Sequence, residues 1–384
     1  MAAFALASTW AWCGQEPRQQ NKQEGPQETF PLYRAETIDF SAPPPIAVAT
    51  RVLCDASGNI YASYSASLPS SPIHYGLDPL RGIFPAAKSV IQYLLPAVPE
   101  YRPLSAASFA VSPRGTVYAL AATIRSEPAD KPKPAIFIVK YKDDGTVDSY
   151  VKVGDEPDRR IQPARMAVFG DGDFLLSGTA VLDDGLGTFA GIFDRQGTFV
   201  TPLEFGQAIA HRGERPTSGS SEPSDETQPS EESHVKRLEA DAKDPVGLAS
   251  STLSFGLQDG NVYVLQGTSE ATLYVVSPAG YIIRKYSLTP PEPGMTPLQM
   301  APAGVGYLFI YYGRMGVAAT AESPAQPDYI AVLNSETGQE TAIYSMRKDE
   351  RGLVIPACAE SPHNFLFLAI SKDQHLEVTR YVAR

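Results

Sequence analysis

The sequence predicts an all-β fold built from repeated four-stranded antiparallel sheets, and three observations lead to this prediction. The first is composition: 34 Pro and 30 Gly among 384 residues favour turns and short strands, and aromatic residues at 10% pack well on a pleated surface. The second is a motif in which glycine separates two short apolar runs, as in CDASGNIYASYS at Cys54–Ser65. The third is the regular recurrence of that motif.

Six copies of the motif mark six units of the chain. The markers are Gly58, Gly115, Gly172, Gly260, Gly306 and His363-Asn364. The first two intervals are 57 residues each, and the last is again 57 residues. A period near 50 residues is typical of propellers and solenoids.

The one long interval, 88 residues, has a visible cause. It contains Ser218–Ser233, a segment with five acids, six serines and no apolar residue. Such a segment cannot bury enough surface to offset the entropy lost on ordering. We therefore expect a disordered acidic insertion at about residues 210–247.

Each unit is expected to contain two hairpins. The marker glycine supplies the positive φ of the first tight turn, and in most units a second glycine hairpin follows. These second turns are predicted at Gly145, Gly197, Gly280 and Gly338. Two hairpins give four antiparallel strands, which form one blade of a β-propeller.

The ends of the chain predict how the ring closes. The last unit stops after strands at Asn364–Ser371 and His375–Val382, so it lacks a fourth strand. The stretch Leu32–Phe40, ahead of the first blade, can supply it and so remove an open sheet edge. The prediction is a six-bladed β-propeller closed by an N-terminal strand that completes the last blade. Seven blades are the alternative, because the first unit has no second glycine turn.

The pattern DASGNIYASY, followed later by YKDDGTVDSY, resembles the NHL-type and related six-bladed propellers. The resemblance covers about residues 30–384 and implies a fold. Propellers include lyases, lactonases, receptors and adaptors, so the resemblance does not choose a function.

The N-terminus predicts export. Residues 1–13 form a signal-like apolar segment, too short to span a bilayer, with Ala5-Leu6-Ala7 as a cleavage site. A polar linker at 14–30 follows, and the propeller occupies 31–384. We expect a periplasmic, envelope-associated or secreted protein without a transmembrane segment. The alternatives are an envelope tether at Cys13 and a buried N-terminal strand.

Charge and cysteine content exclude several classes of partner. The net charge of −11 argues against nucleic-acid binding and against docking on an anionic membrane. Three cysteines without zinc-ligand spacing argue against a structural metal site. We expect a monomer without a cofactor that binds a protein or a small ligand.

No motif in the sequence predicts catalysis. FGDGDFLLSG lacks the last glycine of a phosphate loop, and no nucleophile elbow or zinc-protease motif occurs. Acidic pairs such as Asp143-Asp144, Asp171/Asp173 and Asp183-Asp184 stand at turns, where Asp bonds the local backbone. The five histidines are expected to be solvated or turn residues: His74, His211, His234, His363 and His375.

The expected inner strands carry no acid, which favours a binding or scaffold module over an enzyme. A propeller hydrolase or lyase with an unrecognised site at the channel mouth is the alternative. The residues seven positions before the markers are Arg51, Ser108, Arg165, Leu253, Gln299 and Pro356. We expect them to cluster at one mouth of the channel.

Arg51 and Arg165, with Gln299, are the candidate ligand-binding residues, since two arginines suit an anion. The alternative is that both arginines are exposed strand residues without a ligand.

Two further expectations concern packing. Cys54 and Cys358 lie in the first and last blades, which become neighbours on closure, so a disulfide between them is predicted, with buried free thiols as the alternative. A binding module is expected to expose an apolar patch, for which Tyr101, Tyr311 and Tyr312 are candidates.

Overall fold

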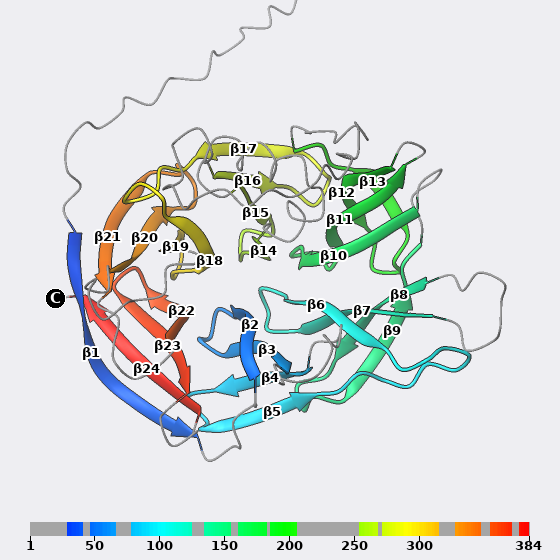
Figure 1. Ribbon diagram of the computed structural model, residues 1–384, viewed down its shortest axis with the longest axis horizontal. Coiled ribbons are helices and arrows are strands. Elements are labelled where there is room, and N and C mark those ends of the chain that lie inside the picture. The colour runs from blue at the N-terminus through cyan, green and yellow to red at the C-terminus, as the bar shows by residue number, and fades with distance from the viewer. Residues whose placement is uncertain are drawn as a thin grey trace, which may run out of the picture.

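The computed structural model is a β-propeller, in which antiparallel sheets stand around a central axis (Figure 1). It describes residues 29–40, 47–66, 78–124, 134–154, 160–182, 185–205, 253–267, 271–314, 327–346, 354–370 and 376–383. The signal-like segment 1–13, most of the linker 14–30 and the acidic insertion 210–247 lie outside these ranges, so those expectations remain predictions.

All described elements are strands. The first half of the chain contains β1 (Thr29–Phe40), β2 (Ala47–Cys54), β3 (Ile60–Ala66), β4 (Asp78–Phe84), β5 (Ser89–Tyr93), β6 (Ser105–Val111), β7 (Val117–Ile124), β8 (Pro134–Tyr141), β9 (Val147–Lys152), β10 (Arg160–Val168), β11 (Phe174–Leu182), β12 (Gly185–Phe193) and β13 (Phe199–Pro202). The second half contains β14 (Leu253–Gly256), β15 (Val262–Gln266), β16 (Thr272–Val276), β17 (Ile282–Ser287), β18 (Thr296–Pro302), β19 (Tyr307–Gly313), β20 (Asp328–Asn334), β21 (Glu340–Met346), β22 (Val354–Ser361), β23 (Asn364–Ile370) and β24 (Leu376–Ala383).

Four sheets have four strands each, and a fifth has eight. The four are β2–β5, β6–β9, β10–β13 and β14–β17, each in chain order. The fifth has the order β18-β19-β20-β21-β1-β24-β23-β22. It consists of two runs of strands that meet at β1.

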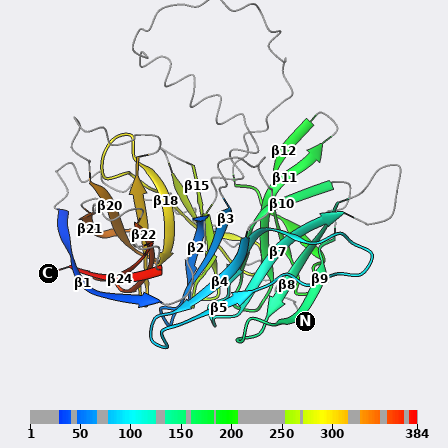
Figure 2. The ribbon, with the colours of Figure 1, turned by 60° about the horizontal axis from the view of Figure 1, so that its bottom comes forward.

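The innermost strands form a closed ring around the axis. They contact one another in the order β2, β6, β10, β14, β18 and β22, and β22 contacts β2. Figure 1 shows these strands nearest the axis, with the later strands of each sheet further out, and Figure 2 shows the same sheets obliquely.

Strand β1 pairs with the C-terminal strand β24, as the sequence predicted. It pairs antiparallel with β24 from Leu32↔Ala383 to Phe40↔Leu376, and Glu36 stands opposite Arg380. Arg380 also joins the side chains of Glu36 and Glu360, both at 2.8 Å. The first three residues of β1 pair in parallel with β21, which links the two halves of the eight-stranded sheet.

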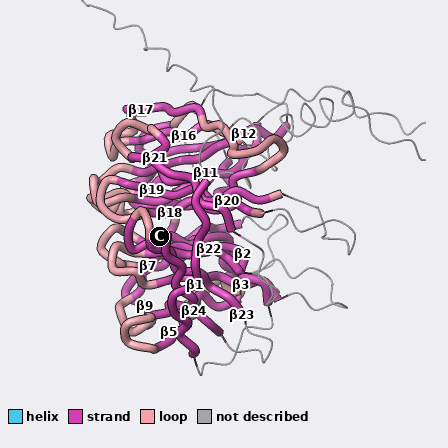
Figure 3. The backbone as a smooth tube through the Cα atoms, turned by 90° about the vertical axis from the view of Figure 1, so that its left-hand side faces the viewer, coloured by secondary structure: helices cyan, strands magenta, loops and turns pink. Residues whose placement is uncertain are grey.

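The tight hairpin turns gather on one side of the ring, which we call the turn face (Figure 3). Its turns include those at residues 55–58, 112–115, 142–145, 169–172 and 194–197. The predicted turn glycines have positive φ, for example +78° at Gly58 and +84° at Gly145. The first unit makes its second hairpin without glycine, because Lys88 adopts a φ of 49°. We call the opposite side, where the connections 94–104 and 288–295 lie, the loop face.

The core lies between adjacent sheets. Ile60 and Ile83 of the first sheet pack against Leu366 and Val378, and comparable apolar layers separate the other sheets. Phe40, at the end of β1, is 2% exposed and belongs to the same layer. The closing strand is therefore held by side-chain burial as well as by backbone pairing.

We expect Phe40→Ala to lower the free energy of unfolding by about 3–5 kcal/mol, because it leaves a cavity in this layer. Asp39→Ala is the control, since Asp39 is exposed on the other side of the same strand. Denaturant unfolding followed by circular dichroism measures both. Equal midpoints for the two variants would show that closure does not depend on this layer.

Candidate functional site

The predicted channel residues lie on inner strands that face the axis. Arg51 stands in the middle of β2, Arg165 in the second half of β10 and Gln299 in the middle of β18. Strand β2 continues for three residues beyond Arg51 on the turn-face side. Leu253 and Pro356 bring no polar side chain to this level.

Arg51 joins four inner strands. Its Nη1 donates to Oγ of Ser108 on β6 at 2.7 Å. Its Nη2 donates to the backbone oxygens of Met166 on β10, at 3.3 Å, and Ser254 on β14, at 3.0 Å. These bonds cross the channel, and the donors of Arg51 are directed at protein acceptors.

Gln299 and Arg165 complete the polar level of the channel. Nε2 of Gln299 donates to the backbone oxygen of Val52, which ties β18 to β2. Burial, and then the nearby charge of Arg165, lowers the pKa of Arg51 to about 9, and burial also lowers the pKa of Arg165. A pKa near 9 still leaves Arg51 charged at neutral pH. The structure thus brings the predicted residues together, mainly in contacts with the protein itself.

Cys54 and Cys358 meet at the junction of the first and last inner strands. Their sulfur atoms are in disulfide contact and their Cα atoms are 5.5 Å apart, within the range for a disulfide. The bond would join residues 304 positions apart and reinforce ring closure beside β1. Its presence in the protein depends on the redox compartment.

The tyrosines predicted for an exposed patch do not form one. Tyr311 is 9% exposed and Tyr312 is 2% exposed, since neighbouring sheets cover both faces of β19. The Tyr311 hydroxyl donates to Asp328 at 2.7 Å. Tyr101 is half-buried against Phe137, with ring centroids 5.2 Å apart.

Two pockets open on the turn face. The smaller, about 220 Å³, lies between sheets β2–β5 and β6–β9. Its lining includes Asp55, Tyr61, Tyr93, Tyr141 and Arg114. The three tyrosines are buried, with centroids of Tyr93 and Tyr141 5.3 Å apart.

In this pocket, the carboxylate of Asp55 accepts hydrogen bonds from residues of its own hairpin. Its carboxylate accepts from the backbone N–H groups of Ser57 and Asn59, from Nδ2 of Asn59 and from the Tyr61 hydroxyl, at 2.8–3.0 Å. Burial first, and then the charge of Asp55, raises the pKa of Tyr61. The same chemistry recurs at Asp259, which accepts from Asn261 and Tyr263.

The larger pocket, about 340 Å³, lies between sheets β6–β9 and β10–β13. Its apolar lining contains Tyr118, Ile138, Val151, Phe169 and Phe174, and its cations are Arg114, Lys140 and Arg195. Arg114 lines both pockets. Sequence reasoning missed these cations, because they come from three different turns or strands and share no spacing.

The acidic pairs behave as turn residues where they are described. Asp144 accepts from the backbone and hydroxyl of Thr146, and Asp171 accepts from the backbone of Asp173. His363 stands in the β22–β23 turn and contacts the Tyr344 hydroxyl at 2.6 Å. The other four histidines and Asp183-Asp184 fall outside the described ranges.

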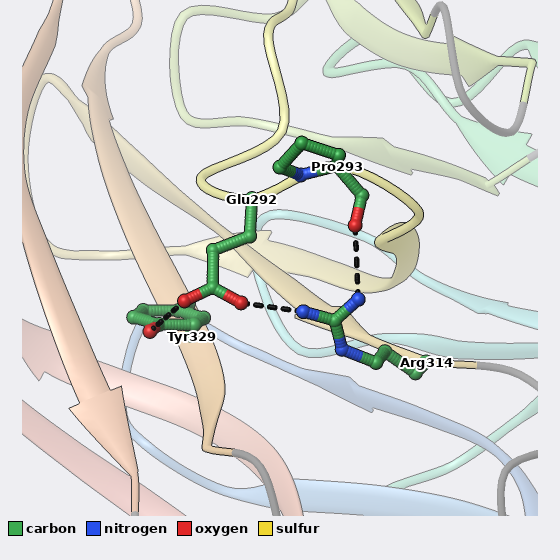
Figure 4. A network of polar contacts seen from close by, with 4 residues as sticks. All are labelled: Glu292, Pro293, Arg314 and Tyr329. Carbon is green, nitrogen blue, oxygen red and sulfur yellow. Dashed lines mark hydrogen bonds and ion pairs between the residues drawn. The ribbon is translucent and has the colours of Figure 1, made fainter.

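On the loop face, a polar network binds a connection to the sheet (Figure 4). Arg314 pairs with Glu292 at 2.5 Å and donates to the backbone oxygen of Pro293 at 2.9 Å. The Tyr329 hydroxyl donates to Glu292 at 2.6 Å, and burial, followed by this hydrogen bond, raises the pKa of Tyr329 to about 12. Here each charged group has a partner in the protein, as expected of a structural contact.

Across the described ranges, no three His, Cys, Asp or Glu side chains come close enough to hold a metal ion. A search of the same residues for a helix able to cross a membrane found none.

Comparison with known proteins adds only fold-level likeness. No protein-family model and no curated protein matches the chain. Among solved structures, it is similar to the Hadza microbial sialidase Hz136, at 11% identity and a TM-score of 0.46, over 86% of this chain and 64% of the sialidase. It is also similar to the Dos1 propeller, at 7% identity and a TM-score of 0.39, over 91% and 95% of the two chains. The polysaccharide lyase Uly1 matches at 9% identity and a TM-score of 0.39, over 88% and 76%.

Replacing the channel arginine tests its structural role. We expect Arg51→Met to lower the free energy of unfolding by about 2 kcal/mol, because Ser108 and two backbone oxygens lose a charged donor. Arg114→Met, on the exposed turn face, should change it by no more than about 0.5 kcal/mol. Denaturant titration measures both, and an unaffected Arg51→Met variant would contradict a structural role.

Alkylation tests the cysteine pair. In the full chain unfolded without reductant, we expect iodoacetamide to label Cys13 alone, and to label all three cysteines after reduction. Mass spectrometry counts the labels. Labelling of Cys54 and Cys358 before reduction, in protein made in an oxidising compartment, would exclude the disulfide. Where it forms, Cys358→Ser should cost about 2–5 kcal/mol.

Proposed function

We propose that this chain is a six-bladed β-propeller that acts as a binding module and meets its ligand or partner on the turn face. The observation that carries this proposal is the pair of adjacent pockets, about 220 and 340 Å³, that share Arg114. The larger falls in the size range of small-molecule sites and combines an apolar wall with a few polar groups.

The arrangement of charges supports the turn face over the channel. Within the described part of the chain, the side chains of Arg114 and Arg195 make no hydrogen bond or ion pair. In contrast, Arg51, Arg314 and Arg380 are engaged by protein acceptors. Cations without internal partners are the ones available to a ligand.

The blade count belongs to the same proposal. The closed order of inner strands and the junction at β1 support treating the eight-stranded sheet as two blades, β18–β21 and β22–β24 with β1. The NHL-type resemblance is proposed on the recurrence of glycine hairpins with positive φ, as at Gly58 and Gly145.

Export is proposed on two grounds. The cysteine pair is placed for a disulfide, which persists in oxidising compartments, and the sequence begins with a signal-like run. We propose a monomer in the periplasm, at the envelope or outside the cell.

A propeller hydrolase or lyase is the competing function. General acid–base catalysis needs groups that can exchange a proton near neutral pH. The convergent ionisable groups in the described channel are Arg51 and Arg165, and arginine is poorly suited to that role. This favours binding over catalysis.

Fragment soaking tests the proposal. Crystals of the chain would be soaked in a library of small neutral and charged fragments, and we expect bound fragments to concentrate in the two turn-face pockets. Parallel assays with esters, lactones, glycosides and acidic polysaccharides should give no turnover above the buffer rate. Fragments gathered in the channel or on the loop face, or turnover by the pure protein, would overturn the proposal.

A further inference from the structure

Two equivalent turns that line the turn-face pockets differ at one residue. Tyr118 stands three residues after Gly115, as Tyr61 stands three residues after Gly58. In the first sheet, Asp55 accepts the Tyr61 hydroxyl. The equivalent position in the second sheet is Ser112, whose Oγ accepts the backbone N–H of Thr116. No carboxylate therefore covers the Tyr118 hydroxyl from its own turn.

The apolar lining of the pocket includes one partly exposed aromatic ring, that of Tyr118. Phe169 and Phe174 line it together with Ile138, but at 1% and 3% exposed the two phenylalanine rings present little surface themselves. Tyr118 remains partly exposed and meets the Phe174 ring edge to face, with centroids 5.4 Å apart. Aromatic walls of this kind favour the packing of a planar ring.

Three cations surround this surface. Lys140 is paired with Asp148 at 2.7 Å, so much of its charge is balanced. Arg114 and Arg195 are exposed and, among the described residues, their guanidinium groups have no partner. The charges of Lys140 and Arg195 oppose the rise that burial causes in the pKa of Tyr118, so both lie near its hydroxyl.

The carboxylates near the pocket accept hydrogen bonds from backbone N–H groups of nearby turns. Asp171 lines the pocket, and its carboxylate accepts the backbone N–H of Asp173. Asp173 in turn accepts the backbone N–H of Arg195, and burial, followed by the charge of Asp171, raises its pKa. These carboxylates disfavour a highly charged anion but leave the donors of both guanidinium groups available.

We propose that this pocket binds a small planar ring that carries one carboxylate or phosphate group. The guanidinium groups of Arg114 and Arg195 bind the anion, for which their paired donors are suited, and the ring packs against Tyr118. This inference rests on the proposed binding function and adds the class of ligand.

Simple probes separate the two parts of the ligand. We expect benzoate or phenyl phosphate to bind, measured by calorimetry and by chemical-shift changes, and the comparison of the two distinguishes a carboxylate from a phosphate source. Benzamide, which keeps the shape without the charge, and inorganic phosphate, which lacks the ring, should each bind at least about tenfold more weakly. Benzylammonium should not bind. Equal affinity for benzamide and benzoate would contradict the requirement for an anionic group. Equal affinity for inorganic phosphate and phenyl phosphate would contradict the requirement for a planar ring.

Variants locate the site. Arg195→Gln, which touches only the larger pocket, and Arg114→Gln should each weaken the bound probe about tenfold. Lys142→Gln is the matched control, because Lys142 is an exposed cation that lines only the smaller pocket, and it should leave affinity unchanged. Ser112→Asp, which installs the residue of the equivalent first turn, should abolish binding. Melting curves confirm that each variant is folded.

The outcomes distinguish this inference from the function on which it rests. If Lys142→Gln weakens binding as much as Arg195→Gln, or if no aromatic anion binds while other fragments occupy the turn face, the ligand class is wrong and the binding function stands. If neither aromatic anions nor other fragments bind the turn face, both are wrong.

Discussion

The structure depends on the antiparallel pairing of β1 with β24, because a ring of sheets is complete only when its last sheet is. Without β1, the outer edge of β24 would expose unpaired backbone groups. The pairing runs from Leu32 to Phe40, and burial of Phe40 between neighbouring sheets holds it in register. A one-residue slip would move Phe40 to the solvent side, so the apolar layer fixes the register.

Closure also determines what can happen at the axis. Once the inner strands form a ring, their side chains and some of their carbonyl groups point into a narrow shared space where buried polar groups need partners. Arg51 and Gln299 satisfy this need by bonding across the channel. The donors of Arg51 are therefore bonded to the protein at the axis, and we propose that the ligand binds between sheets on the turn face.

Much of the fold could be predicted from the sequence because its hairpins depend on local turn residues that recur along the chain. Glycines with positive φ recur at the predicted markers, and the closing strand was expected from the strand missing at the C-terminus. The turn at Lys88 could not be recognised, since a lysine in the left-handed conformation has no sequence signature. The prediction that Tyr311 and Tyr312 lie on the surface was wrong. Both belong to β19, and because neighbouring sheets cover both faces of this strand, side chains on either face are buried.

The candidate site was less predictable for a related reason. The spacing of Arg51 from its marker glycine predicted that it lies on an inner strand, as it does. Spacing along one strand does not show how deep the side chain lies in the channel. It also does not show which backbone carbonyl groups of other strands accept its hydrogen bonds. Arg114 and Arg195 belong to different sheets, and only the packing of one sheet against the next brings them to the same pocket. Sites formed between repeats depend on such pairings, which no single repeat contains.

The contrast between the first two turns shows how a repeat can gain a site without losing its fold. The turn at Asp55 uses a carboxylate to accept hydrogen bonds from Asn59 and from the Tyr61 hydroxyl. Ser112 accepts the backbone N–H of Thr116 within its turn, but its side chain is shorter and uncharged. Turn formation and pocket chemistry are therefore separable at this position. The equivalent turns at 169–172 and 257–260 form with Phe169 and Leu257 there, whereas an anion is favoured where no carboxylate stands.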